Sequence, residues 1–299
     1  MSGAGTWIAI GCGLGAALCF GVGDYLAQRL THRHGAMSAM FAVQVASLLV
    51  LATIGAAWYG APRAAPEQVA AVIGIGLVNT LGMIGLYRAL ERGKLSLVSP
   101  IAGSMGAFAV AFAWLAGTPP PAVVIPGLFA VVLGIVAAST VDEPTPKRGA
   151  SKLGRALGVG WALLSALGFG WVFSVLGQRS VALGPVWTIA ILRLVAIVLL
   201  IALAKPLRVR PTAALGREQP SSRGRTLAIA CLDSGGMVLV ALGGAGEPGD
   251  AAVVAVLASS FPLITIALAR VYLREGLRWW QWIGVAMVLI GVAWVSAIY

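Results

Sequence analysis

The chain has 299 residues, of which 59% are apolar and 10% are charged, and its 21 basic and 10 acidic residues give a net charge of +11. Ordinary globular proteins carry about 25% charged residues, so this composition excludes a soluble globular protein. The basic residues lie mainly between apolar runs, where attraction to anionic lipids accounts for the positive charge, and we expect no nucleic-acid partner.

Apolar runs between charged or Pro/Gly-rich segments predict ten transmembrane helices, each near the length of roughly 20 residues that crosses a bilayer. The fold class is therefore an all-α polytopic membrane protein. The longest hydrophilic segment, residues 205–225, is expected to be a mobile loop. The predicted helices are 7–28, 36–58, 68–87, 95–115, 122–140, 153–178, 185–204, 226–243, 251–272 and 279–298.

The two halves of the chain share a pattern that indicates an internal duplication. We expect a first repeat at 1–141, a linker at 142–152 and a second repeat at 153–299, with five helices in each repeat. An odd number of helices inserts the second repeat upside down, and inverted repeats with a substrate path between them are typical of transporters. The matched residues are Phe20-Gly21, Gly35, Gln44, Asn79, Gly82 and Gly127 with Phe169-Gly170, Gly184, Arg193, Asp233, Gly236 and Gly284.

The basic residues also predict an orientation. Eighteen of the 21 lie in or beside the loops after the first, third, fifth, seventh and ninth helices, whereas the opposite side holds Arg63 and Arg179. The positive-inside rule places those five loops in the cytoplasm and both termini outside a bacterial-type plasma membrane.

Two ionisable residues lie deep in predicted helices, where a charge costs roughly 2.5–3.5 kcal/mol and needs a partner or a watery cavity. The backbones of Asp233 and Arg193 differ in depth by roughly 8 Å, a gap that the long Arg193 side chain can largely cover, so a salt bridge can join them. Their counterparts in the first repeat are Asn79 and Gln44. One interpretation is that the pair only holds helices together. The other is that both residues line a central cavity and bind a polar or zwitterionic substrate, with Asp233 exchanging a proton with it. Neutral contacts could come from Tyr87, Asn79, Gln44, Ser234 and Trp171.

Three further residues could shape the path or gate it. Pro100 and Pro262 each remove a backbone hydrogen bond within a predicted helix and favour a kink there. Asp24 lies near the end of the first predicted helix, where we expect a solvated carboxylate at the cytoplasmic edge or a gating pair. The three cysteines are expected to pack in apolar runs, and neither a metal nor a cofactor is predicted.

Two alternative functions remain open, an intramembrane enzyme and a flippase for lipid-linked substrates. The run Gly21-Val22-Gly23-Asp24 has the G-x-G-D form of intramembrane aspartyl proteases. Such enzymes need a second carboxylate that shares a proton with the first, and Asp233 is expected at a different depth. The sequence therefore favours a protein that is not an enzyme.

Two segments resemble a family signature. The first is Tyr87-Arg88-Ala89-Leu90 with Gly93 and Val98-Ser99-Pro100-Ile101, and the second is the run 257–262 with Thr265, Ala269-Arg270, Glu275, Gln281 and Gly284. These segments resemble the EamA-type transporters of the drug/metabolite transporter superfamily. Two positions depart from that pattern: Thr118-Pro119-Pro120 stands where the family often has a Glu, and Gly106 where it often has a Pro.

The resemblance implies two inverted five-helix repeats that alternate access to a central cavity and export amino acids, other metabolites or drugs. We therefore expect an exporter of amino acids or other small polar metabolites that acts as a monomer or weak dimer among membrane lipids. Family members are commonly drawn with cytoplasmic termini, so the charge count and the resemblance differ on orientation.

Overall fold

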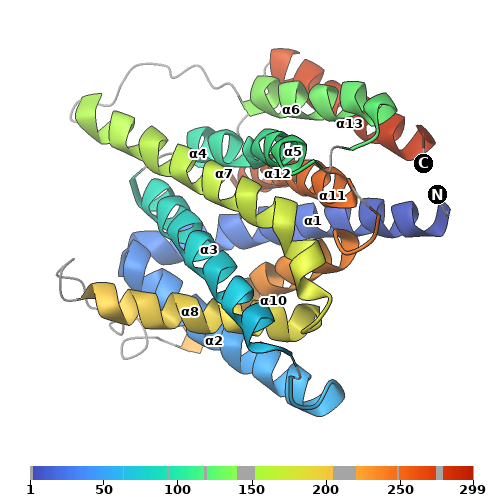
Figure 1. The fold of residues 1–299 in the computed structure, drawn as a ribbon. Helices are drawn as coiled ribbons and strands as arrows, with labels where there is room; N and C mark the ends of the chain where they lie inside the picture. Colours follow the sequence, from blue (N-terminus) through green and yellow to red (C-terminus); the bar gives the residue numbers. More distant parts are fainter. Residues whose placement is uncertain are drawn as a thin grey trace.

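The structure is a computed structural model that describes residues 3–62, 64–92, 95–117, 120–139, 152–204, 220–247, 249–273 and 279–298. Within these ranges the chain forms helices and short connections and no strand (Figure 1). The helices are α1 (Gly3–His34), α2 (Ala36–Trp58), α3 (Pro66–Arg92), α4 (Leu95–Gly103), α5 (Met105–Leu115), the 3-10 helix η1 (Ala122–Val124), α6 (Ile125–Ser139), α7 (Lys152–Ser180), α8 (Pro185–Ala204), α10 (Pro220–Gly243), α11 (Asp250–Ala258), α12 (Phe261–Leu273) and α13 (Trp279–Ile298).

The structure confirms the all-helical membrane fold. Seven of the described segments are long and apolar enough to cross a bilayer, and the shorter apolar helices Ile101–Leu115 and Ala122–Gly134 accompany them. The number of ten spans stays a prediction. The bounds of α2, α8 and α13 agree with the predicted helices. The start of α10 shows that residues 220–225 of the expected loop are helical, while 205–219 and the linker 140–151 lie outside the described residues.

Helix α1 is longer than its apolar run predicted. The run ends at Gln28, but the helix continues to His34 because Leu30 is fully buried on one face while the basic side chains lie on the other. Arg29 Nη2 donates a hydrogen bond of 2.6 Å to the hydroxyl oxygen of Tyr25, which stabilises this last section. The helix ends at Gly35, whose φ of 79° is a left-handed conformation that suits glycine.

Gly35 has a structural counterpart in the second half of the chain. Gly184 has a φ of 75° at the turn between α7 and α8, just as Gly35 does between α1 and α2. In both turns the glycine carbonyl accepts a hydrogen bond from the next helix, through the N–H of Ala39 in one and of Thr188 in the other. The sequence match between the two glycines therefore corresponds to the same turn in each half.

The first helix of each half packs against helices of the other half. Helix α1 lies against α10, α11 and α12 of the second half, and α7 lies against α3, α4 and α5 of the first. A Cβ atom on Gly21 would lie 2.8 Å from the carbonyl oxygen of Phe261, and one on Gly170 would lie 2.8 Å from that of Met105. Equivalent glycines thus let equivalent helices approach closely, as small residues do in membrane proteins.

The outer helices also pack in pairs, one helix from each half, and one of these pairs approaches closely at a glycine. Helix α6 packs on α13, and α2 packs on α8, on opposite sides of a central group that contains α1 (Figure 1). A Cβ atom on Gly291 of α13 would lie 2.5 Å from the carbonyl oxygen of Gly127 on α6. The space between the repeats is therefore bounded by α1, α3, α7 and α10, which carry most of the polar residues predicted for the site.

Two helices expected to be continuous are interrupted. The first interruption, at Ser104, separates α4 from α5, and the second, at Ser259 and Ser260, separates α11 from α12. The Ser104 hydroxyl donates to the carbonyl oxygen of Ile101 at 2.7 Å, and the Ser260 hydroxyl donates to that of Leu257 at 2.7 Å. These bonds give the carbonyls a partner where the helical bond is lost.

The two interruptions lie differently relative to the prolines, and the kink expected at Pro100 stays a prediction. Helix α4 runs through Pro100 and ends three residues later at Gly103, so the interruption does not lie at Pro100. Pro262 does lie directly after an interruption, as its missing N–H predicts. The interruptions pack together, since a Cβ atom on Gly106 would lie 2.6 Å from the Ser259 hydroxyl oxygen. Close approach of the two broken helices explains why a glycine occupies this position.

Candidate substrate cavity between the repeats

A cavity with an empty volume of about 440 Å³, including space open to solvent, lies between the two halves. Both halves contribute to the lining, from α1, α3, α4 and α5 on one side and from α7, α8, α10 and α12 on the other. The lining residues are Phe20, Asp24, Asn79, Met83, Leu86, Ala102, Met105, Phe169, Phe173, Arg193, Asp233, Met237 and Phe261.

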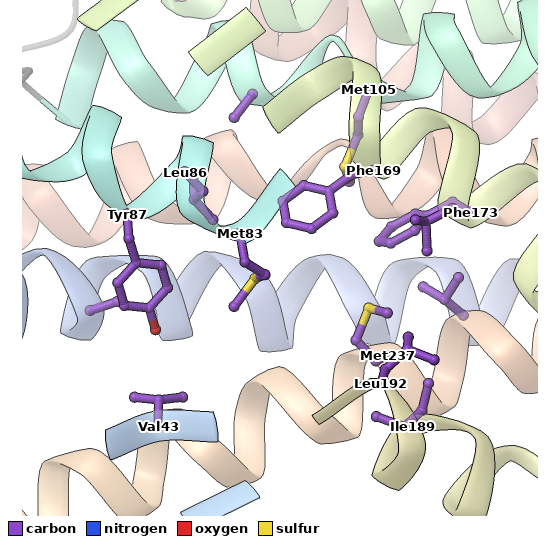
Figure 2. Close-up of a cluster of buried hydrophobic side chains, with 14 of the residues drawn as sticks. Val43, Met83, Leu86, Tyr87, Met105, Phe169, Phe173, Ile189, Leu192 and Met237 are labelled. Carbon is purple, nitrogen blue, oxygen red and sulfur yellow. The ribbon is translucent and has the colours of Figure 1, made fainter. Parts of the chain in front are cut away.

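Most of this lining is apolar. Figure 2 shows Met83 of α3 and Phe169 of α7 extending into the space between the helices, with Phe173 and Met237 beyond them. Phe173 is the centre of a continuous aromatic wall, with its ring centroid 5.9 Å from that of Phe20 and 6.1 Å from that of Phe169. Phe20 and Phe169 were predicted only as matched positions of the two repeats, and their place in the cavity was not predicted. Their recurrence at equivalent positions was the available signal.

The charged pair predicted from the sequence is present. Arg193 Nη2 lies 2.9 Å from Asp233 Oδ2, although its N–H bonds are not directed at that oxygen as a hydrogen bond requires. Arg193 Nη1 donates a hydrogen bond of 3.1 Å to Gln44 Oε1. The Arg193 side chain is 1% exposed and that of Asp233 is 17% exposed. A buried guanidinium depends on such partners because it has lost its hydration.

The four residues that the repeat alignment paired lie around this ion pair. Gln44 and Arg193 are counterparts in the two halves, and the hydrogen bond joins one directly to the other. Asn79 and Asp233 are the second pair of counterparts, and both line the cavity. Pairs of equivalent residues meet where two repeats are related by a rotation axis, so these side chains mark the boundary between the halves.

Several buried polar atoms here have no hydrogen-bond partner within the described residues. Asn79 is 1% exposed, and neither its Oδ1 nor its Nδ2 is bonded. Three further buried atoms have no hydrogen-bond partner in the described part of the chain: the hydroxyl oxygen of Ser234, the amide nitrogen of Gln44 and Nε of Arg193. Because an unpaired buried polar group costs about 1–3 kcal/mol, a cluster of them calls for water or a polar ligand as partner.

The structure corrects the expected position of Asp24. This residue lines the cavity, together with Asp233, and is not a solvated carboxylate at the end of a helix. The reason is the length of α1, which places Asp24 ten residues before His34 and, at about 1.5 Å per residue, roughly 15 Å from the helix end. No hydrogen bond or ion pair joins Asp24 to another side chain of the described ranges.

The structure places only some of the other predicted contact residues close to the charged residues of the cavity. Tyr87 is 2% exposed and lines a smaller pocket that also includes Asp24 and Asp233. Ser234 is buried beside Asp233 along α10 but does not line the cavity. Trp171 is half-buried against the apolar core and is also outside the lining. Its position on α7 differs from that of Phe169 and Phe173, which face the cavity instead.

The two ends of the cavity differ. The smaller pocket extends past Gly23 and Ala27 of α1 and Tyr87 of α3, toward the ends of both helices. At the opposite end, the backbone of Gly177 on α7 contacts that of Gly244 after α10. The Gln178 amide nitrogen donates to the carbonyl oxygen of Gly246 at 3.1 Å. Helix α7 is thus packed against the chain at the end of α10 on this side.

The described residues include no group of three or more His, Cys, Asp or Glu side chains that could hold a metal ion. The polar groups of the cavity are instead one guanidinium, two carboxylates and an amide, which bind organic molecules through charge and hydrogen bonds. A helical membrane protein built from two repeats around a central cavity with buried charges is characteristic of membrane transporters.

The comparisons with known proteins agree with that class. The model of the EamA-like transporter family matches residues 7–140 and 156–297, so the chain belongs to this family. One solved crystal structure has the same fold, with a TM-score of 0.75, 16% sequence identity, and coverage of 97% of this chain and 96% of the other. A comparison with curated proteins found no match. The protein is therefore a membrane transporter by family, with a small-molecule substrate and a membrane environment.

Proposed function

We propose that this transporter exports amino acids or other small polar metabolites by alternating access. The observation that carries the proposal is a cavity at the boundary of the two repeats that contains a buried ion pair and unpaired polar atoms. Charged groups at the membrane interior are costly, and transporters use them at the substrate site. Asp233, Arg193 and Asn79 are the proposed binding residues, with Gln44 holding Arg193 in position.

The difference between the two ends of the cavity supports alternating access. On one side the contacts of Gly177 and Gln178 join α7 to the end of α10, and we take these contacts as the closed gate, while on the other side the pocket beside Tyr87 shares lining residues with the cavity. The ends of α1 and α3 near Tyr87 belong to the side that the basic residues assign to the cytoplasm. This state would receive substrate from the cytoplasm, which is the first step of export. The helix interruptions at Ser104 and at Ser259 and Ser260 are the proposed flexible points.

The shared cavity of Asp24 and Asp233 favours one second candidate, an aspartyl protease-like enzyme. In a catalytic pair, two carboxylates share a proton and activate water. Here Asp233 faces Arg193 at 2.9 Å, and a guanidinium on one of the carboxylates is not part of such a pair. The family is a transporter family, which also favours transport over catalysis.

The proposed function is tested by comparing the solutes in the culture medium of cells with and without overexpression of the protein. An exporter raises the concentration of a specific solute outside the cell, and right-side-out vesicles containing the protein release that solute faster than empty ones. Cleavage of membrane peptides by the purified protein, without any change in exported solutes, would instead establish the enzyme.

The loop charges predict the orientation, which a thiol-labelling experiment can measure. A cysteine placed within residues 205–225 should resist an impermeant thiol reagent applied to intact cells, whereas one placed after Ile298 should react. Both are introduced after replacement of Cys12, Cys19 and Cys231, and permeabilised cells provide the control in which both sites react. Labelling of the loop cysteine in intact cells would reverse the orientation and leave the fold unchanged.

A further inference from the structure

The charges that line the cavity do not balance. The lining contains two carboxylates, Asp24 and Asp233, and one guanidinium, Arg193. Arg193 is engaged by Asp233 and by Gln44. Within the part of the chain that the structure describes, no basic side chain forms an ion pair with Asp24. Asp24 is therefore a carboxyl group of the lining without a basic partner among the described residues, and a cation that entered beside it would stabilise its ionised form.

The surface around Asp24 is suited to an apolar body on that cation. Phe20 lies one helical turn before Asp24 on α1, and its ring begins the aromatic wall that continues through Phe173 to Phe169. Phe261 and three methionines complete the apolar lining. Aromatic faces attract cations, and methionine side chains adapt to the shape of an apolar ligand. A small, fully hydrophilic solute would leave most of this surface without a partner.

The described lining of the cavity has no cation that is free to bind a negatively charged group of the substrate. Arg193 is the cation of the lining, and a substrate carboxylate beside it would lie next to Asp233, whose Oδ2 is 2.9 Å from Nη2. Two carboxylates bound to one guanidinium repel each other, and the repulsion is stronger in a site of low dielectric constant. The ion pair thus supplies polarity at one side of the cavity, while its two charges neutralise each other.

We propose that the substrate is an organic amine in its ammonium form, with an apolar, preferably aromatic, body and no carboxylate. This inference rests on the proposed transport function, and within its substrate class it excludes amino acids, which carry a carboxylate, in favour of amine metabolites. Asp24 pairs with the ammonium group, and Oδ1 of Asn79, which has no partner in the described structure, accepts an ammonium N–H. The wall of Phe20, Phe173 and Phe169 packs against the apolar body.

Three probes with the same aromatic body separate the charge requirements. They are 2-phenylethylamine, a cation; phenylalanine, a zwitterion; and 3-phenylpropionate, an anion. Binding of each to the full-length protein in lipid nanodiscs is measured by isothermal titration calorimetry at neutral pH. We expect the amine to bind about tenfold or more tightly than phenylalanine, a difference of about 1.4 kcal/mol, and the anion to bind least.

Matched variants assign the effect to Asp24. Asp24→Asn should weaken amine binding about tenfold or more, while Asp24→Glu, which keeps the charge, should retain most of it. Glu247→Gln is the control, because Glu247 is an exposed carboxylate in the turn after α10 and outside the cavity lining. Thermal unfolding and gel filtration of each variant verify that it is folded, and Asp24→Glu provides the comparison if Asp24→Asn proves unstable.

Each other result overturns the substrate class. Equal or tighter binding of phenylalanine would show that Arg193 receives a carboxylate, and tighter binding of the anion would show that the site is cationic. Binding of none of the three probes at millimolar concentration, or amine binding unaffected by Asp24→Asn, would remove Asp24 from recognition. The transport function fails separately, by the absence of any exported solute upon overexpression.

Discussion

Asp233→Asn is expected to lower the free energy of unfolding by about 3–5 kcal/mol and to abolish transport, because it leaves the guanidinium of Arg193 buried without a counter-charge. Arg193 cannot relieve this cost by losing its proton. The hydrogen bond of 3.1 Å to Gln44 remains but supplies no negative charge. Unfolding in mixed micelles with increasing denaturing detergent measures the stability, and solute release from vesicles measures transport.

The double variant Asp233→Asn with Arg193→Gln tests whether the pair serves transport as well as folding. It removes both charges and copies the amides that the first repeat has at Asn79 and Gln44, so most of the lost stability should return. We expect this variant to fold and to fail in transport, since the cavity has lost the ion pair at the boundary between the repeats. Near-normal transport by the double variant would exclude both residues from the binding site. Additive stability losses from the single changes would contradict their coupling.

A second ion pair in the protein provides the matched control for these substitutions. Arg88 Nη1 lies 3.3 Å from Glu91 Oε2, with the two side chains 19% and 28% exposed. A pair with this access to solvent contributes about 0–1 kcal/mol, so Arg88→Gln should change the stability far less than Arg193→Gln does. An equal effect of both changes would show that burial of Arg193 is not the cause.

Gly177→Ala is expected to separate α7 from the end of α10 and so to open the gate proposed at this contact. The backbone of Gly177 contacts that of Gly244, and a Cβ atom has no room between them. Overpacking of this kind costs about 1–3 kcal/mol in the closed state, which shifts the populations of the two states about 5- to 150-fold toward the open one. Transport should fall, because a protein that rarely closes this end cannot complete the cycle.

The measurement is the reactivity of Met237→Cys, a cavity position on the α10 side, toward an impermeant thiol reagent applied to intact cells. Native cysteines are removed first, and Gly177→Ala should then raise the labelling rate several-fold. Gly160→Ala on the same helix is the control, because no atom lies within 4 Å of the position its Cβ would occupy. Unchanged labelling with Gly177→Ala would show that the contact with Gly244 does not close this end.

The properties that follow from composition and local pattern could be predicted from the sequence. A low content of charged residues and long apolar runs require a helical membrane protein, because the bilayer leaves no other way to pair the backbone polar groups of such a chain. The repeated glycines and the pairs Gln44 with Arg193 and Asn79 with Asp233 indicated the two-repeat architecture. Arg193 and Asp233 stood out because a charge within a membrane helix is costly.

The tertiary structure decided the features that depend on how the halves pack together. Asp24 joined the cavity because burial of Leu30 against other helices extends α1 past its apolar run, which hydrophobicity along the chain does not reveal. The first interruption lies at Ser104, four residues after Pro100. The aromatic wall and the contact at Gly177 bring together residues that are distant in the sequence, so only the approach of α1, α7 and α10 in space defines them.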